Sequence, residues 1–206
     1  DIPSGATVAI GGFFTCGAPT YLTKALAKLG VKGLTIIIQS FGVGALEVNE
    51  LVENDQVQKV IGNYPFYRSA ERGARHRFEQ LVRAGKIAVE VYPMSTFVEK
   101  MRAGGAGIAA FYTPTGAGTL VAEGKETRIF NGREYVLETA LKPDFALVHA
   151  WKGDTDGNLT YRKTARNYNV AMAMSARVTI AEVEQLVEPG QINPDCTHTP
   201  GIYVQR

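Results

Sequence analysis

Two adjacent glycines, Gly11 and Gly12, follow a short apolar run and precede a segment that favours a helix. Glycine adopts backbone angles and permits close approaches that a Cβ would forbid. A strand that turns directly into a helix can aim free backbone N–H groups at an oxyanion, a phosphate or a carboxylate. Gly17-Ala-Pro19 then leads into the expected helix, because proline fits a helix start. The turn is a candidate anion site, and a purely structural glycine turn fits the same residues.

Two further loops carry hydroxyl groups next to glycines. Ser40-Phe-Gly-Val-Gly44 follows the second expected strand, and open parallel sheets bind ligands at the carboxyl ends of their strands. We therefore expect this loop and the Gly11-Gly12 turn to face one crevice. Thr113-Pro-Thr-Gly-Ala-Gly-Thr119 interleaves hydroxyls with glycines, which suits ligand binding and tight turns equally well.

A basic segment runs from Tyr64 to Gln80. Arg68, Arg72 and Arg75 recur there at spacings that place them along one helical stripe. A solvated helix face fits this stripe, and so does a basic lip that attracts an anionic substrate.

The sequence shows no catalytic constellation of its own. His76, His149 and His198 stand in three different contexts, so no local histidine–carboxylate pair indicates a base, and His149 is interpreted as a satisfied core residue. No nucleophile elbow, Walker loop or dinucleotide fingerprint is present. Cys16 and Cys196 lack metal-ligand spacing and are expected to be free thiols, with no metal bound. Loops suited to ligand binding in a chain without an evident nucleophile are consistent with a catalytic group supplied by another chain.

The loops must be positioned by alternating strands and helices. The first strand, helix and strand span about 35 residues, which is the length of a βαβ unit with a right-handed crossover. Strands are expected at Thr7–Ile10, Leu34–Gln39, Val57–Gly62, Ile87–Val91, Ile108–Tyr112, Phe145–Trp151 and Val178–Val183, and helices at Thr20–Leu29, Leu46–Glu53 and Thr96–Arg102.

Local signals refine this pattern. Ser95 or Thr96 with Glu99 predicts a capping box, and Asn131-Gly132 predicts a hairpin between Glu126 and Glu138. The tail from Pro189 onward is expected to be coil. The sequence thus predicts an α/β fold, a single domain over residues 1–206 with a largely parallel central sheet flanked by helices, plus an antiparallel hairpin.

Composition excludes several functions. With 206 residues, 45% hydrophobic and 20% charged, the chain can bury a full core. A formal net charge of +2 gives no support to nucleic-acid binding driven by bulk charge. No apolar run approaches the roughly 18 to 20 residues of a membrane span, and no signal peptide is visible, so we expect a cytoplasmic protein without a membrane partner.

Several runs carry a family resemblance. Val8-Ala-Ile-Gly-Gly-Phe-Phe-Thr-Cys-Gly-Ala-Pro19 resembles the signature of the A (alpha) subunit of family I coenzyme A transferases, in which three apolar residues precede Gly-Gly-Phe, three variable residues and Gly-x-Pro. Four more runs look like the same subunit of 3-oxoacid and 3-oxoadipate transferases: Arg102-Ala-Gly-Gly-Ala-Gly-Ile, Phe111-Tyr-Thr-Pro-Thr-Gly-Ala-Gly-Thr-Leu-Val-Ala-Glu-Gly-Lys-Glu126, Gly157-Asn-Leu-Thr-Tyr-Arg-Lys-Thr-Ala-Arg-Asn-Tyr-Asn169 and His198-Thr-Pro-Gly-Ile-Tyr203. The resemblance covers essentially the whole chain.

The resemblance implies a ping-pong exchange through a covalent intermediate. A glutamate attacks an acyl-CoA, passes through an acyl anhydride, becomes a glutamyl-CoA thioester and hands CoA to a second carboxylate. In the split enzymes this glutamate belongs to a B (beta) subunit, in a Ser-Glu-Asn-Gly type motif that this sequence lacks. The resemblance therefore implies no catalytic nucleophile in this chain, a partnership of two A and two B chains, and a CoA thioester as substrate rather than a tightly bound cofactor.

The resemblance and the crevice argument together indicate the residues that shape the acyl pocket and its oxyanion donors. They are Gly11, Gly12, Phe13, Gly17, Pro19, Ser40, Phe41, Met94, Ser95, Thr113, Thr115, Gly116 and Gly118, with Arg68, Arg72 and Arg75 as the basic lip.

One departure from the family pattern concerns the substrate. Relatives usually read Pro-Gln-Gly-Thr-Leu where this chain has Pro93-Met-Ser-Thr-Phe97, and Met94 cannot donate the hydrogen bond of a glutamine amide. Either a neighbour such as Ser95 substitutes, or the substrate differs from acetoacetate. A dicarboxylic acceptor such as 3-oxoadipate, with succinyl-CoA as donor, would suit the basic segment. An acyl-CoA hydrolase or lyase on the same scaffold and a non-catalytic small-molecule sensor are the alternatives.

Overall fold

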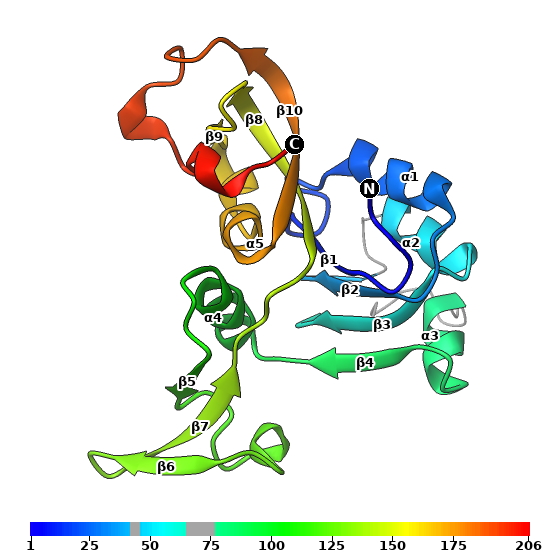
Figure 1. The fold of residues 1–206 in the computed structure, drawn as a ribbon. Coiled ribbons are helices and arrows are strands. Elements are labelled where there is room, and N and C mark those ends of the chain that lie inside the picture. The colour runs from blue at the N-terminus through cyan, green and yellow to red at the C-terminus, as the bar shows by residue number, and fades with distance from the viewer. Residues whose placement is uncertain (42–45, 65–76) are drawn as a thin grey trace.

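A seven-stranded sheet forms the centre of the computed structural model, which describes residues 1–41, 46–64 and 77–206 (Figure 1). Six strands pair in parallel, as the βαβ pattern predicts, and a short seventh strand pairs antiparallel with β8. In spatial order they are β10 (Val178–Val187), β8 (Phe145–Asp154), β1 (Thr7–Ile10), β2 (Leu34–Ile38), β3 (Val57–Gly62) and β4 (Ala88–Val91), with β9 (Leu159–Thr160) beside β8.

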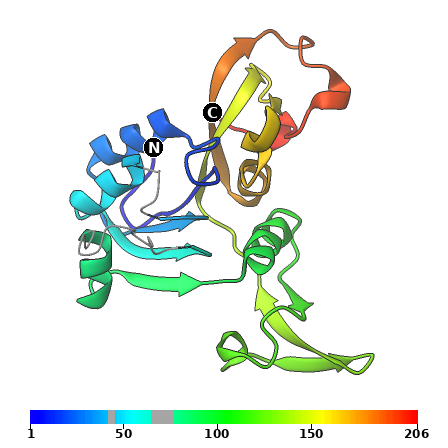
Figure 2. The same ribbon diagram turned by 180° about the vertical axis from the view of Figure 1, so that it is seen from behind.

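Helices cover both faces of this sheet. Successive side chains of a strand point to opposite faces, so Ile10 joins one core and Ala9 the other. The first core is closed by α1 (Thr20–Leu29), α2 (Leu46–Glu53) and α3 (Arg77–Arg83), and the second by α4 (Met94–Gly105) and α5 (Asn169–Ser175). Figure 2 shows the two helical layers from behind. The two-sided burial explains why β2 reads as an almost continuous apolar run.

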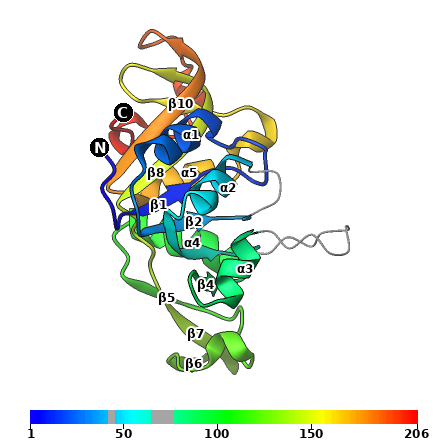
Figure 3. The same cartoon turned by 90° about the vertical axis from the view of Figure 1, so that its right-hand side faces the viewer.

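A second, smaller sheet projects below the first (Figure 3). It contains β5 (Ala110–Thr113), β7 (Arg133–Thr139) and β6 (Thr127–Phe130), in that order and antiparallel. The predicted hairpin is confirmed: Asn131 and Gly132 both have positive φ, as a two-residue hairpin turn requires. The strand expected at Ile108–Tyr112 corresponds to β5, but its place beside β7 rests on pairing across a long stretch of sequence. Short 3₁₀ helices lie at η1 (Leu120–Ala122), η2 (Lys163–Arg166), η3 (Pro194–Cys196) and η4 (Gly201–Tyr203).

The predicted start of α4 is wrong. The helix begins two residues earlier, at Met94, with Pro93 before it and no side-chain cap. Glu99 does not close a capping box but binds Arg102 through both of its oxygens. The helix also runs through Gly104 and Gly105, where a Cβ would overlap the carbonyl oxygens of Leu141 and Met174. These glycines permit close packing rather than a turn.

The C-terminal tail is more ordered than the predicted coil. Besides two 3₁₀ turns, it pairs with the start of β10: Gln205 donates to the carbonyl oxygen of Thr179 at 3.0 Å, and Ala181 donates to that of Arg206 at 2.9 Å. These backbone contacts extend the edge of the sheet, and the apolar pattern of the tail carries no signal for them.

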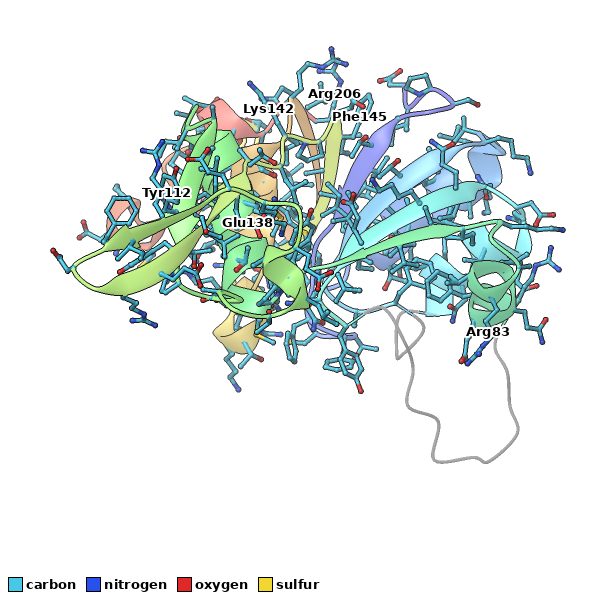
Figure 4. The ribbon with its side chains drawn as sticks, turned by 90° about the horizontal axis from the view of Figure 1, so that it is seen from below. Arg83, Tyr112, Glu138, Lys142, Phe145 and Arg206 are labelled. Atoms are coloured by element: carbon cyan, nitrogen blue, oxygen red, sulfur yellow. The ribbon has the colours of Figure 1, made fainter. Side chains whose placement is uncertain are left out.

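A buried ionic group joins the small sheet to α4. Lys100 of α4 and Glu138 of β7 are each 2% exposed, and their charged atoms lie 3.0 Å apart. Lys125 binds the other oxygen of Glu138 at 2.6 Å, and both ammonium groups lie over the ring of Tyr92. Burial, with the nearby charges of Glu90 and Glu138, raises the pKa of Tyr92 to about 12. Figure 4 shows Glu138 inside the molecule, with Tyr112 further out on the small sheet. We call Lys100, Glu138 and Lys125 the ionic strut.

Removing one partner of the strut should destabilise the protein strongly. Lys100→Met leaves a buried carboxylate with one of its two cations gone, and we expect a loss of about 3 kcal/mol in the free energy of unfolding. Urea denaturation of the purified protein measures it, with the exposed Lys142→Gln as control. A loss no larger than that of the control would contradict the structural role of the strut.

Candidate functional site

The residues from Gly11 to Pro19 form a closed turn at the carboxyl end of β1, which we call the signature turn. Phe13 and Cys16 exchange two backbone hydrogen bonds of 3.0 Å each, and Phe14 between them has a φ of 52°. The N–H of Gly11 donates to the carbonyl oxygen of Leu147 in β8 at 2.8 Å. These three N–H groups are therefore used within the protein rather than held free for an anion.

Gly11 is required by a buried amide. Asn169, at the start of α5, is 0% exposed. Its Nδ2 donates to the carbonyl oxygens of Gly17 and Ala165 at 2.9 Å each, and its Oδ1 accepts from the backbone N–H of His149 at 3.2 Å. A Cβ on Gly11 would lie 1.9 Å from that Oδ1. The amide thus holds the signature turn against α5 and β8, and only glycine fits beneath it.

The start of α1 is also occupied. Leu22 in its first turn donates its backbone N–H to Oε2 of Glu182, from β10, at 2.9 Å. A carboxylate at this position is stabilised by the positive end of the helix dipole. The protein therefore supplies its own anion to this N–H group, and the anion site expected at the Gly11-Gly12 turn stays a prediction.

A chain of aromatic contacts runs from the signature turn to α4. Phe13 is 37% exposed and stacks on Tyr168, with ring centroids 6.2 Å apart and nearly parallel planes. Tyr168 in turn contacts Phe97 of α4, and Phe14 contacts Tyr64 after β3. Burial raises the pKa of Tyr168, so its hydroxyl stays protonated. We call these five rings the aromatic wall.

A cavity of about 400 Å³ opens where α4 begins. Three predicted site residues, Ser95, Thr113 and Thr115, share it. Thr96 also lines the cavity; its side chain is almost fully buried, and its Oγ1 has no hydrogen-bond partner in the described chain. The remaining lining residues are Glu99, Phe111 and Tyr112. Met94 lies at the first position of α4 and is 54% exposed.

The structure also places Ser40, Phe41, Gly116 and Gly118. Ser40 is buried and forms an isolated β-bridge with Tyr64, where β2 and β3 end. Phe41 is fully buried and stacks on Phe78 of α3, so it belongs to the core rather than to the crevice. Gly116 is needed under Val121, whereas Gly118 has open space around it and only its positive φ favours glycine.

Some predictions lie outside the described residues or find no support. Arg68, Arg72 and Arg75 fall in the undescribed range 65–76. His149 is not a satisfied core residue, because its Nδ1 is buried and has no partner among the described residues.

Among the described residues, no group of three or more metal-binding side chains lies together, and no helix is long and apolar enough to cross a membrane.

Sequence reasoning misses Asn169, Tyr168 and Thr96 as site residues. Asn169 and Tyr168 lie in the conspicuous run of cationic and amide residues after β9, but nothing in their spacing shows that they meet a turn some 150 residues away. Thr96 resembles a cap in the sequence, and only the true start of α4 shows that it lines the cavity.

The turn from Arg162 to Asn167, which includes η2, lies beside the signature turn, and a histidine binds the residue just before it. Tyr161 donates its backbone N–H to Nδ1 of His198 at 2.9 Å, so this nitrogen must be unprotonated. Burial, assisted by the charge of Arg166, lowers the pKa of His198. Protonation would replace the acceptor with a second N–H donor and break this hydrogen bond.

The family follows from the whole-chain comparison. The pattern of the family described as Coenzyme A transferase matches residues 1–206, and the chain belongs to this family of enzymes. It is 50% identical over 205 residues to the A subunit of the succinyl-CoA:3-ketoacid coenzyme A transferase of Xanthomonas campestris pv. campestris (strain B100), covering 100% of this chain and 82% of that protein. It is 47% identical over 205 residues to the A subunit of the 3-oxoadipate CoA-transferase of Pseudomonas putida, covering 100% and 87%.

A solved structure confirms the fold but not the reaction. A variant of the decarboxylase AibA/AibB superposes with a TM-score of 0.78 at 27% sequence identity, covering 99% of this chain and 76% of that one. The predicted α/β fold is therefore shared with an enzyme of a different class, and the fold alone does not define the chemistry.

The clash beneath Gly11 predicts a specific coupling. Gly11→Ala should destabilise the protein by about 2 to 4 kcal/mol because the new methyl overlaps Asn169. Asn169→Ala removes the overlapping oxygen, so the double variant should be about as stable as Asn169→Ala alone. Urea denaturation of the three variants and the wild type gives the double-mutant cycle. Strictly additive losses would show that the methyl does not meet this amide.

His198 predicts a pH dependence with a defined sign. A base whose pKa is lower in the folded state binds fewer protons there than when unfolded, so stability falls as the pH drops below about 6.5. His198→Gln cannot be protonated and should lose less stability between neutral and mildly acidic pH than the wild type. Urea midpoints at the two pH values measure the difference. Identical pH dependence in both proteins would contradict the assignment.

Proposed function

We propose that this chain is the A subunit of a heteromeric CoA-transferase, which moves CoA from an acyl-CoA to a 3-oxo acid in the cytoplasm. The main support for this proposal is a sequence identity of 47 to 50%, across the full chain, to proteins named as the A subunits of such enzymes. Succinyl-CoA is the proposed donor, and 3-oxoadipate or acetoacetate the acceptor. Residues 1–206 act as one domain, and CoA enters as a substrate rather than as a bound cofactor.

The aromatic wall and the start of α4 form this chain's half of the acyl site. Phe13 presents the exposed ring that excludes water from the reacting thioester, and the buried rings of Tyr168 and Phe97 pack behind it. The amides of the first turn of α4 precede its first intrahelical bond, from Phe97 to Pro93, and can donate to a developing oxyanion. Ser95 lies in the same turn, is exposed and lines the cavity, so its hydroxyl supplies a donor that Met94 lacks.

The carboxylates of this cavity are poor nucleophiles. Both oxygens of Glu99 accept hydrogen bonds from Arg102, which lowers the pKa of this carboxyl. Glu126, near the cavity, is likewise bound by Tyr112 and Arg128. An anion that is already paired attacks slowly, which supports a nucleophile from the partner.

The covalent steps therefore fall to a glutamate of a B subunit, in a complex of two A and two B chains. Its carboxylate attacks the thioester carbonyl and releases CoA as thiolate, leaving an acyl anhydride. The thiolate then attacks the glutamyl carbonyl, which frees the donor acid and forms the glutamyl-CoA thioester. The acceptor carboxylate repeats these two steps in reverse, leaving with CoA and restoring the glutamate.

Reconstitution tests this proposal. The purified chain is mixed with its partner subunit, succinyl-CoA and one acceptor acid, and formation of the acceptor's CoA thioester is measured by chromatography. We expect transfer only when both subunits are present, because the nucleophile and the pocket belong to different chains. Release of free CoA at full rate without any acceptor would indicate a hydrolase and overturn the transferase assignment.

A lyase is the second candidate, because a decarboxylase shares this fold at 27% identity. The same reconstituted complex, given a carboxylated acyl-CoA alone, would then release carbon dioxide. Carbon dioxide release without any transfer would favour this candidate.

A further inference from the structure

The turn between β9 and α5 concentrates exposed positive charge. Arg162, Lys163 and Arg166 lie within five consecutive residues, and all three side chains are exposed. Arg162 lies 3.5 Å from Glu184 and over the ring of Trp151. Among the described residues, Lys163 and Arg166 form no ion pair. We call Arg162–Arg166 the basic turn.

The basic turn is held at a fixed place beside the signature turn. Asn167 donates through Nδ2 to the carbonyl oxygens of Thr164, at 2.7 Å, and Cys16, at 3.0 Å. Sγ of Cys16 lies 3.2 Å from Oγ1 of Thr164, and the buried Asn169 amide joins Ala165 to Gly17. The basic turn and the residues just after it are thus tied to the turn that begins the acyl site.

Lys163 has a strained backbone conformation. Its φ is 52°, in the left-handed region that residues with a Cβ rarely adopt. Its side chain is exposed and has no described ion-pair partner. Such strain persists where the surrounding structure enforces it, and it gathers at sites that bind ligands.

Residues of the basic turn and of the signature turn together line a cavity of about 250 Å³. Cys16, Gly17, His149, Trp151, Thr164 and Glu184 are among the residues that line it. Glu184 is the acid in this lining and faces Arg162 and His149, so the charges of Lys163 and Arg166 stay uncompensated. Lys152 adds another cation over Trp151. The local field therefore favours an anion.

We propose that the basic turn binds the phosphate groups of coenzyme A and leaves its thioester end free to reach the aromatic wall. This proposal rests on the proposed function. CoA carries a pyrophosphate and a 3′-phosphate at the end far from its sulfur, and Arg and Lys bind phosphate oxygens through charge-assisted hydrogen bonds. Because the basic turn is fixed to the signature turn, phosphates held there anchor the substrate at a set distance from the reacting centre.

The test compares substrates with and without phosphates in the reconstituted complex. Lys163→Asn removes the charge while asparagine still tolerates the left-handed backbone, and Arg166→Gln removes the second charge. For the pair of substitutions we expect KM for succinyl-CoA to rise roughly tenfold with kcat nearly unchanged. With succinyl-pantetheine, which lacks the phosphates, variant and wild type should behave alike. Arg133→Gln with Lys142→Gln removes two exposed cations elsewhere and should leave both substrates unaffected.

The proposal is overturned if the double variant keeps the wild-type KM for succinyl-CoA. It is also overturned if KM rises equally for succinyl-CoA and for succinyl-pantetheine. A weaker association of the two subunits in sedimentation experiments, with KM unchanged, would instead show that the basic turn docks an acidic surface of the partner. Loss of the proposed function is distinguishable, because the wild-type complex would then transfer no CoA at all.

Discussion

The arrangement of the site depends on one buried amide. Asn169 ties together three segments that are distant in sequence: the signature turn through Gly17, the basic turn through Ala165, and β8 through the N–H of His149. An amide without these partners would be costly to bury, so all three contacts must form together. Gly11 has no side chain because this amide occupies the space, and the glycine-rich signature is the sequence trace of that packing.

A second constraint is electrostatic and positions the other half of the site. The ionic strut fixes β7 against α4, and with it the loop after β5 against the first turn of that helix. The strut therefore holds Thr113 and Thr115 opposite Ser95 and supports the cavity between them. At the start of α1, Glu182 accepts a hydrogen bond from the backbone N–H of Leu22. The chain thus supplies its own anion at the start of α1.

The sequence predicts the frame better than the site. The apolar runs of β1 to β3 and the Asn131-Gly132 turn are local signals, so the parallel sheet and the hairpin follow from them. The capping box fails because Pro93 and the packing of Thr96 move the start of α4, and Phe41 faces the core because its ring packs on Phe78. The role of Asn169 depends on a contact across some 150 residues, which no periodicity reveals.

We propose that this chain shapes the acyl site while another chain supplies the nucleophile. The most direct measurement is the intact mass of each subunit after the complex is mixed with an acyl-CoA and quenched. We expect the mass of the partner to rise by that of CoA in thioester linkage, while this chain stays unmodified. A CoA adduct on this chain, with the partner unchanged, would contradict it.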